Sequence, residues 1–147
     1  MKVHITVPSE DQLLSHSVVV KIALKGQSWS QDQLGEYAKR QGIYVIHHRE
    51  RIIYIGKTDG STMTFGMRLR REFQETASQG KHIYPKLASL AIPPDIRVSF
   101  LTLPQIHHLV DSEETTIDDI AKTGILEQTL ICIYNPELQK EKTAKVK

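Results

Sequence analysis

Residues 42–56, GIYVIHHRERIIYIG, contain the triplets Gly42-Ile43-Tyr44 and Tyr54-Ile55-Gly56, placed symmetrically about Arg49. β-Branched and aromatic residues dominate both halves, and the polar run between them is typical of a turn. We predict a β-hairpin with a three-residue loop over 48–50. In that register Tyr44 lies directly opposite Tyr54, on the same face of the sheet, with Cβ atoms about 5 Å apart. The glycine beside each tyrosine lets other groups approach the backbone closely.

The two triplets resemble the signature of the GIY-YIG nuclease superfamily, which has the same triplets at about this spacing. The resemblance covers residues 41–139 and implies an α/β (α+β) fold with a small three-stranded antiparallel sheet flanked by helices. Residues 1–40 lie outside it, and we expect them to form a partly helical extension used for packing or recognition. Residues 140–147 are a basic tail. The activity implied by the resemblance is metal-dependent endonuclease cleavage of phosphodiester bonds.

Hydrophobic periodicity and capping signals predict the remaining elements. Capping boxes start at Ser9, Ser30 and Thr116, and Gly80 suits the residue after a helix. Residues 18–22 also favour a strand, which leaves the first helix open to that alternative. The predicted helices cover 9–25, 30–40, 66–79, 85–90 and 116–133, and the predicted third strand covers 96–100.

The composition is ordinary for a soluble globular protein, with 39% hydrophobic and 24% charged residues. No apolar run approaches the ~20 residues that span a bilayer, and the first residues lack the features of a signal peptide. A single cysteine, Cys132, allows no internal disulfide and no zinc cluster. We therefore expect an intracellular, cytoplasmic protein without a membrane partner, and the sequence leaves its oligomeric state open.

Charge is unevenly distributed along the chain. Residues 39–97 hold eleven Lys/Arg against five Asp/Glu, a net +6, whereas residues 98–137 hold one Lys against seven Asp/Glu, a net −6. A basic region around the tyrosine hairpin is typical of a face that binds a polyanion. The alternative is an uneven surface charge with no partner.

The resemblance assigns catalytic roles to Tyr44, Tyr54, Arg68 and Glu127. Tyr44 would take a proton from the attacking water, and Tyr54 would position the phosphate or the water. A phenol can act as a base only where nearby cations favour its ionised form, and Lys57 is a candidate cation. Arg68 would grip the scissile phosphate, because a guanidinium binds phosphate in a bidentate manner. The alternative for Arg68 is an ordinary i,i+4 ion pair with Glu72.

Glu127 also has an argument of its own, because it falls within the apolar stripe of the last predicted helix, with Gly124, Ile131 and Tyr134. A carboxylate in such a stripe must be paired, protonated or bound to a cation. The resemblance makes it the single protein ligand of Mg²⁺ or Mn²⁺. Magnesium accepts one protein carboxylate because it keeps most of its waters and binds substrate phosphate. The alternative is a glutamate at the edge of the stripe that reaches solvent.

Two positions depart from the family pattern. Glu72 stands where many members carry a histidine, and Gln139 stands where the family usually has an asparagine, for which Asn135 could also substitute. Double-stranded DNA is the expected substrate; a non-catalytic nucleic-acid-binding module and an RNA-directed nuclease or toxin are the alternatives. The residues expected to contact nucleic acid are Gly56, Lys57, Arg70, Arg71, His82 and Lys86.

Overall fold

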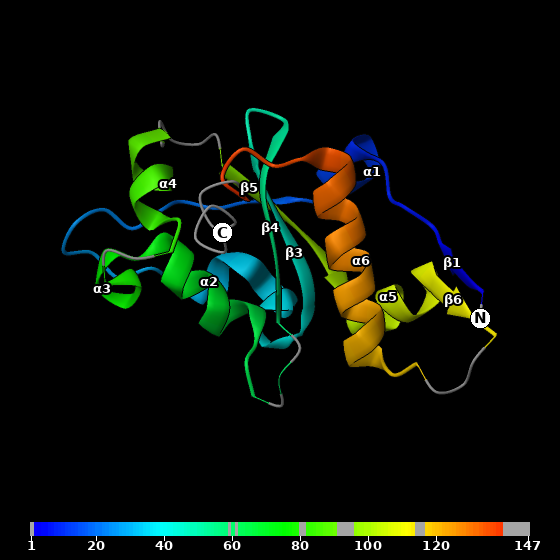
Figure 1. Cartoon of the computed structure of the whole chain (residues 1–147). Helices are drawn as coiled ribbons and strands as arrows, with labels where there is room; N and C mark the ends of the chain where they lie inside the picture. Colours follow the sequence, from blue (N-terminus) through cyan, green and yellow to red (C-terminus); the bar gives the residue numbers. More distant parts are fainter. Residues whose placement is uncertain are drawn as a thin grey trace.

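The computed structural model describes residues 2–58, 60, 62–79, 82–90, 96–113 and 117–139. At its centre lies a four-stranded antiparallel sheet in the order β2-β5-β3-β4 (Figure 1). The fold is mixed α/β, as predicted. The prediction gave this sheet three strands, and the structure adds the short edge strand β2. A separate two-stranded sheet joins β1 to β6. The strands are β1 (Val3–Ile5), β2 (Val18–Val19), β3 (Gly42–His48), β4 (Arg51–Thr58), β5 (Ile96–Thr102) and β6 (Val110–Ser112).

Helices cover both faces of the central sheet and bury a hydrophobic core on each side (Figure 1). The first core contains Tyr44 and Tyr54, and the second contains Ile43 and Ile55. The first face is covered by the 3₁₀ segment η1 (Gln31–Lys39) with α2 (Phe65–Phe73) and α4 (Tyr84–Leu90), and the second by α1 (Glu10–Ser15), α5 (Leu103–Leu109) and α6 (Asp119–Tyr134). The short helix α3 (Glu75–Ser78) packs against α2 and α4.

The hairpin exists, but its register differs from the prediction. The turn has two residues, Arg49 and Glu50, both with positive φ, as a type I′ turn requires. A β-bulge at Ile53 then adds one residue to β4, so that Tyr44 pairs with Gly56 and not with Tyr54. Without the bulge, a two-residue turn would have turned the tyrosines to opposite faces. With it, they share one face, with ring centroids 6.1 Å apart.

Of residues 2–30, only α1 is helical. The capping box of Ser9 with Gln12 is confirmed, but the predicted helix to residue 25 is wrong. The alternative of a strand within 18–22 is confirmed, because the chain turns at Ser17 and pairs with β5 as β2. Further along, the backbone N–H of Ala23 donates to the carbonyl of Phe73, 2.8 Å away. The first 39 residues thus contribute β1 and β2 to the two sheets, and they contribute side chains to both hydrophobic cores.

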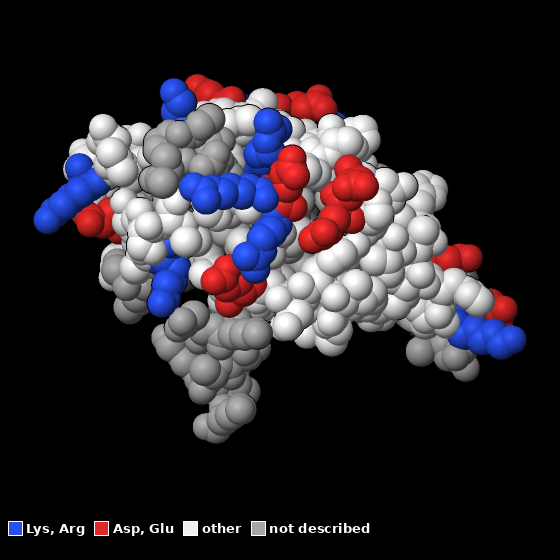
Figure 2. All heavy atoms as spheres, turned by 90° about the horizontal axis from the view of Figure 1, so that it is seen from above, with Lys and Arg blue, Asp and Glu red and all other residues white. Residues whose placement is uncertain are grey.

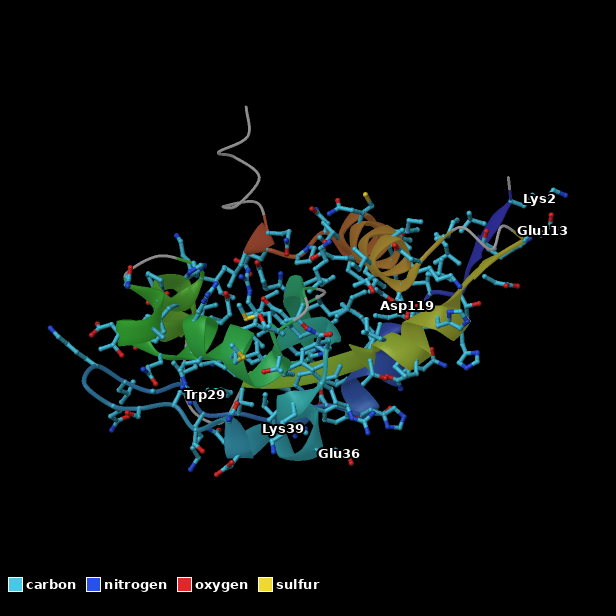
Figure 3. All side chains as sticks on the ribbon, turned by 90° about the horizontal axis from the view of Figure 1, so that it is seen from below. Lys2, Trp29, Glu36, Lys39, Glu113 and Asp119 are labelled. Atoms are coloured by element: carbon cyan, nitrogen blue, oxygen red, sulfur yellow. The ribbon has the colours of Figure 1, made fainter. Side chains whose placement is uncertain are left out.

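The predicted helix over 66–79 is interrupted at Gln74, which has extended φ and ψ. The Gln74 side chain accepts a hydrogen bond from the backbone N–H of Trp29, 2.8 Å away, and Gln74 forms a bridge with Ala23. Trp29, labelled in Figure 3, packs on Phe73 with ring centroids 5.4 Å apart. Tertiary contacts with the N-terminal segment therefore divide this helix. Gly80, the predicted end of the helix, lies outside the described residues.

The other predicted elements agree with the structure to within a few residues. They are β5, α4 and α6, although α6 has Asp118 as its N-cap and the predicted cap, Thr116, lies outside the described residues. Ser30 caps the segment over 31–39, which is a 3₁₀ helix kinked at Gly35. The sequence analysis did not predict α5, β1 or β6. None of the described helices combines the length and the apolar character that crossing a bilayer requires.

Candidate active site

Tyr44 lies at the centre of the candidate site, on the face of the sheet covered by α2. Its ring crosses the backbone of Gly56: a β-carbon at that position would lie 2.3 Å from both Cζ and Oη of Tyr44. The edge of Phe65 packs against the same ring, with an interplanar angle of 89°. Glycine at position 56 is therefore required by the close approach of the tyrosine.

Arg68 reaches the Tyr44 hydroxyl from the helix that follows the hairpin. Helix α2 starts at Thr64, whose hydroxyl accepts the N–H of Met67, and it buries the apolar row Phe65, Leu69 and Phe73 against the sheet. This orientation leaves Arg68 partly exposed beside the sheet, with its Nε donating to the Tyr44 hydroxyl at 3.4 Å. The structure therefore brings together the two side chains expected to act on the phosphate and the water.

Glu72 adds a carboxylate to this cluster, one helical turn after Arg68, and it is only 1% exposed. Burial raises the pKa of Tyr44 well above its usual value, and the charges of Glu72 and Tyr54 raise it further, while Arg68 lowers it. Burial opposes the charge of Arg68, but Tyr44, Glu72 and Tyr54 outweigh that effect and raise its pKa. The cluster therefore holds a neutral phenol beside a firmly charged guanidinium.

The sequence contains a signal for the burial of Glu72. It lies seven residues after Phe65 and three after Leu69, which places it in the apolar stripe of α2. The same pattern predicts burial for Glu127, which is indeed buried, at 9% exposure. The place of Glu72 beside Tyr44 and Arg68 is not among the predictions made from the sequence.

Glu127 and Lys57 lie on the other side of the sheet from the tyrosines. Lys57 pairs with Ile43, and its Nζ lies 3.8 Å from the position that a β-carbon would take at Gly124, one helical turn before Glu127. Lys57 therefore points toward α6, and the cation that contacts Tyr44 is Arg68. Gln128 donates to the Glu127 carboxylate at 3.4 Å.

Gln139 and Asn135, the two expected substitutes for the family asparagine, have different positions. The buried Gln139 side chain accepts the N–H of Ile55 at 3.1 Å, and Leu138 donates to the carbonyl of Ile53 at 2.9 Å. The residues after α6 thus cover the outer edge of β4, next to Tyr54. Asn135 is exposed and ends α6 in a left-handed conformation, away from Tyr44.

The residues expected to contact nucleic acid are spread over several elements. Arg70, His82 and Lys86 are exposed and Arg71 is partly exposed, whereas Gly56 is covered by the ring of Tyr44. Figure 2 views the end of the molecule toward which the β3–β4 turn points, and there basic and acidic side chains lie side by side. The exposed ion pair of Arg51 with Glu137, at 3.8 Å, is an example of such mixing.

Comparison of the chain with protein-family models, with curated proteins and with solved structures finds no match. The described residues contain no group of three or more His, Cys, Asp or Glu side chains arranged to hold a metal ion. The site is therefore interpreted from its own geometry and from the residues of the two triplets.

Proposed function

We propose that this chain is a phosphodiesterase of the GIY-YIG type that cleaves DNA. The observation that carries the proposal is the contact of Arg68 with the Tyr44 hydroxyl, beside Tyr54 and across from Gly56. Tyr44, Tyr54 and Arg68, three of the four side chains that the resemblance makes catalytic, lie within one cluster, whereas Glu127 lies on the other side of the sheet. This agreement supports the proposal, because a chance match to the two triplets would not require the following helix to place an arginine beside Tyr44.

In the proposed reaction Arg68 binds a non-bridging phosphate oxygen and stabilises the charge that develops on it. Tyr44 orients the attacking water through its hydroxyl, and Tyr54 positions the phosphate. Because the pKa of Tyr44 is raised, its hydroxyl enters the reaction as a neutral phenol. It can accept the proton of the water only as it gives up its own, and the Glu72 carboxylate is the acceptor that the cluster provides.

Glu127 is the residue that would hold the metal. A buried carboxylate offers the oxygen ligand that Mg²⁺ and Mn²⁺ prefer, so the donor chemistry fits a site with one protein ligand. A bound ion would supply charge stabilisation at the departing 3′ oxygen. Lys57 lies close to the same turn of α6, and its ammonium provides a second positive charge on this side of β4.

A non-catalytic nucleic-acid-binding module is the second candidate, and one observation favours it. Tyr44 and Tyr54 are 0% and 1% exposed, so neither phenol is accessible to a substrate in this conformation. In this alternative the buried tyrosines and Glu72 form a structural polar cluster with the partly exposed Arg68, and binding depends on exposed cations such as Arg70. Catalysis would require the partly exposed Arg68 side chain to shift and admit a phosphate.

Nicking of supercoiled plasmid DNA with Mg²⁺ or Mn²⁺ separates the two candidates. A nuclease cuts, and Tyr44→Phe, Arg68→Ala and Glu127→Gln each lower the rate at least 100-fold while circular dichroism stays unchanged. Arg70→Ala is the matched control, because it removes an exposed cation from the same helix and should change the rate less than tenfold. Salt-sensitive DNA binding without cleavage in any divalent metal would refute the nuclease and support the binding module.

A parallel digestion of single-stranded RNA tests the substrate class. Preference for DNA agrees with the proposal. Cleavage of RNA alone, with the same dependence on Arg68, would replace the DNA nuclease by an RNA-directed one.

A further inference from the structure

A cavity of about 490 Å³ lies beside β5, apart from the tyrosine–arginine cluster. It exists because β2 is very short and pairs only with Arg97 and Val98, so it does not cover β5 from Ser99 onward. Helices α1 and α5 and the residue Tyr37 of η1 flank the uncovered part, and the cavity is open to solvent. A volume of this size is in the range of small-molecule sites.

The walls of the cavity are largely apolar and partly rigid. Leu13 and Leu101 belong to the buried core, at 4% and 7% exposure, and Leu109 packs against it. On the other side Tyr37 stacks on Phe100, with ring centroids 4.6 Å apart and an interplanar angle of 18°. Such walls suit a flat apolar body.

Two glutamines on the lining have amide orientations fixed by capping boxes. The Oε1 atom of Gln12 accepts the backbone N–H of Ser9 at 2.9 Å, and Oε1 of Gln105 accepts the N–H of Thr102 at 2.8 Å. Oε1 of Gln105 also accepts the Thr102 hydroxyl at 3.1 Å. Because each Oε1 is directed into its capping box, each Nε2 is left as a hydrogen-bond donor. Among the described residues neither Nε2 has a partner.

The other polar residues of the lining are Thr6, Tyr37, Ser99 and the exposed His16 and His108, each of which can supply an N–H or O–H donor. The described lining includes no Asp or Glu side chain. Imidazoles and amide N–H groups can satisfy a carboxylate, whereas a cation would find no carboxylate to pair with. We infer that this cavity binds a small amphipathic carboxylate, with its apolar body between Leu101 and the Tyr37–Phe100 stack and its carboxylate toward Gln12 and Gln105.

The inference does not depend on nuclease activity. Phe100 pairs with Tyr44 across the ladder between β5 and β3, but the cavity lies on the outer edge of β5. Tyr44, Arg68 and Glu127 are not among its lining residues. A ligand could therefore bind in a variant that has lost the tyrosine–arginine contact.

Titration of the chain of residues 1–147 with 2-naphthoate, followed by ¹H–¹⁵N NMR, tests the inference. We expect saturable binding with shifts of the side-chain amides of Gln12 and Gln105, and no comparable binding of neutral 2-naphthamide. The informative variants are Gln12→Glu and Gln105→Glu. Glutamate keeps the oxygen that completes each capping box but replaces the donor by a negative charge. Each should weaken naphthoate binding at least tenfold.

Gln27→Glu is the matched control, since its Oε1 likewise accepts a backbone N–H, that of Leu24 at 3.0 Å, and its exposed side chain is not part of the cavity lining, so the affinity should be unchanged. Three results would overturn the inference: no saturation by millimolar 2-naphthoate, equal binding of 2-naphthamide, or unchanged affinity in both glutamate variants. Binding of 2-naphthoate by the Tyr44→Phe variant would show that this cavity does not depend on the proposed nuclease site.

Discussion

Gly56→Ala is the sharpest test of how the tyrosine site is built. The new β-carbon would lie 2.3 Å from Cζ and Oη of Tyr44 and 2.8 Å from its Cε1. Contacts this short cannot persist, so the ring or the strand must move. Tyr44 is 0% exposed and is enclosed by Phe65 and Tyr54, which leaves the ring little space. We expect a loss of about 2–3 kcal/mol in the free energy of unfolding, typical of overpacking a tight core.

Urea denaturation and thermal melting measure this loss, which corresponds to a melting temperature lower by roughly 5–10 °C. Gly60→Ala is the control, since nothing lies within 4 Å of its added β-carbon, and it should change stability by less than about 0.5 kcal/mol. Tyr44→Leu removes the atoms that clash, so in that background Gly56→Ala should lose most of its effect. Equal stability of Gly56→Ala and wild type, or strictly additive effects in the double variant, would refute the packing described here.

Two further predictions concern the polar groups on either side of the hairpin. Burial, with a smaller effect of Arg97, lowers the pKa of His47 to about 4, so its folded form binds protons less readily than its unfolded form. Stability should therefore fall as the pH falls from about 6.5 toward 4, by about 2 kcal/mol between pH 7 and pH 5, and His47→Gln should flatten this slope in urea titrations. An identical slope in the variant would contradict this assignment. Gln139→Ala removes the acceptor of the Ile55 N–H and should lower stability by about 1–3 kcal/mol and speed hydrogen exchange at Ile55; unchanged exchange there would disprove the bond.

The sequence correctly predicted those strands and helices that a hydrophobic pattern within a single segment reveals. The alternation of Ile96, Val98 and Phe100 identified β5, and the apolar row of Phe65, Leu69 and Phe73 identified the buried face of α2. Each pattern arises because one face of the element is buried, and it can be recognised from the sequence of that segment alone. Helix α5 also had a local signal, the capping box of Thr102 with Gln105, which the sequence analysis did not use.

The incorrect predictions concern contacts between distant segments. Val18 and Val19 pair with β5, 78 residues or more away, and Gln74 breaks a helix because Trp29 and Ala23 bind there. The strand propensity of residues 18–22 indicated a strand but not its partner, and nothing in residues 66–79 indicates the contacts of Gln74. For the candidate site, the sequence indicated Tyr44 and Arg68, and the structure brings them into contact. The apolar stripe of α2 also contains Glu72, but only the structure shows that this buried carboxylate lies beside Tyr44 and Arg68.

The bulge at Ile53 has a consequence for how this hairpin tolerates changes in length. The pairs of Ile46 with Tyr54 and of Tyr44 with Gly56 lie beyond the bulge, whereas His47 pairs with Ile52 before it. In a chain that lacked Ile53, all of these pairs could still form, and they would make one continuous ladder without a bulge. The number of residues between the two triplets can therefore change by one without exchanging the faces of the sheet, so a relative with a different spacing could still present its tyrosines side by side.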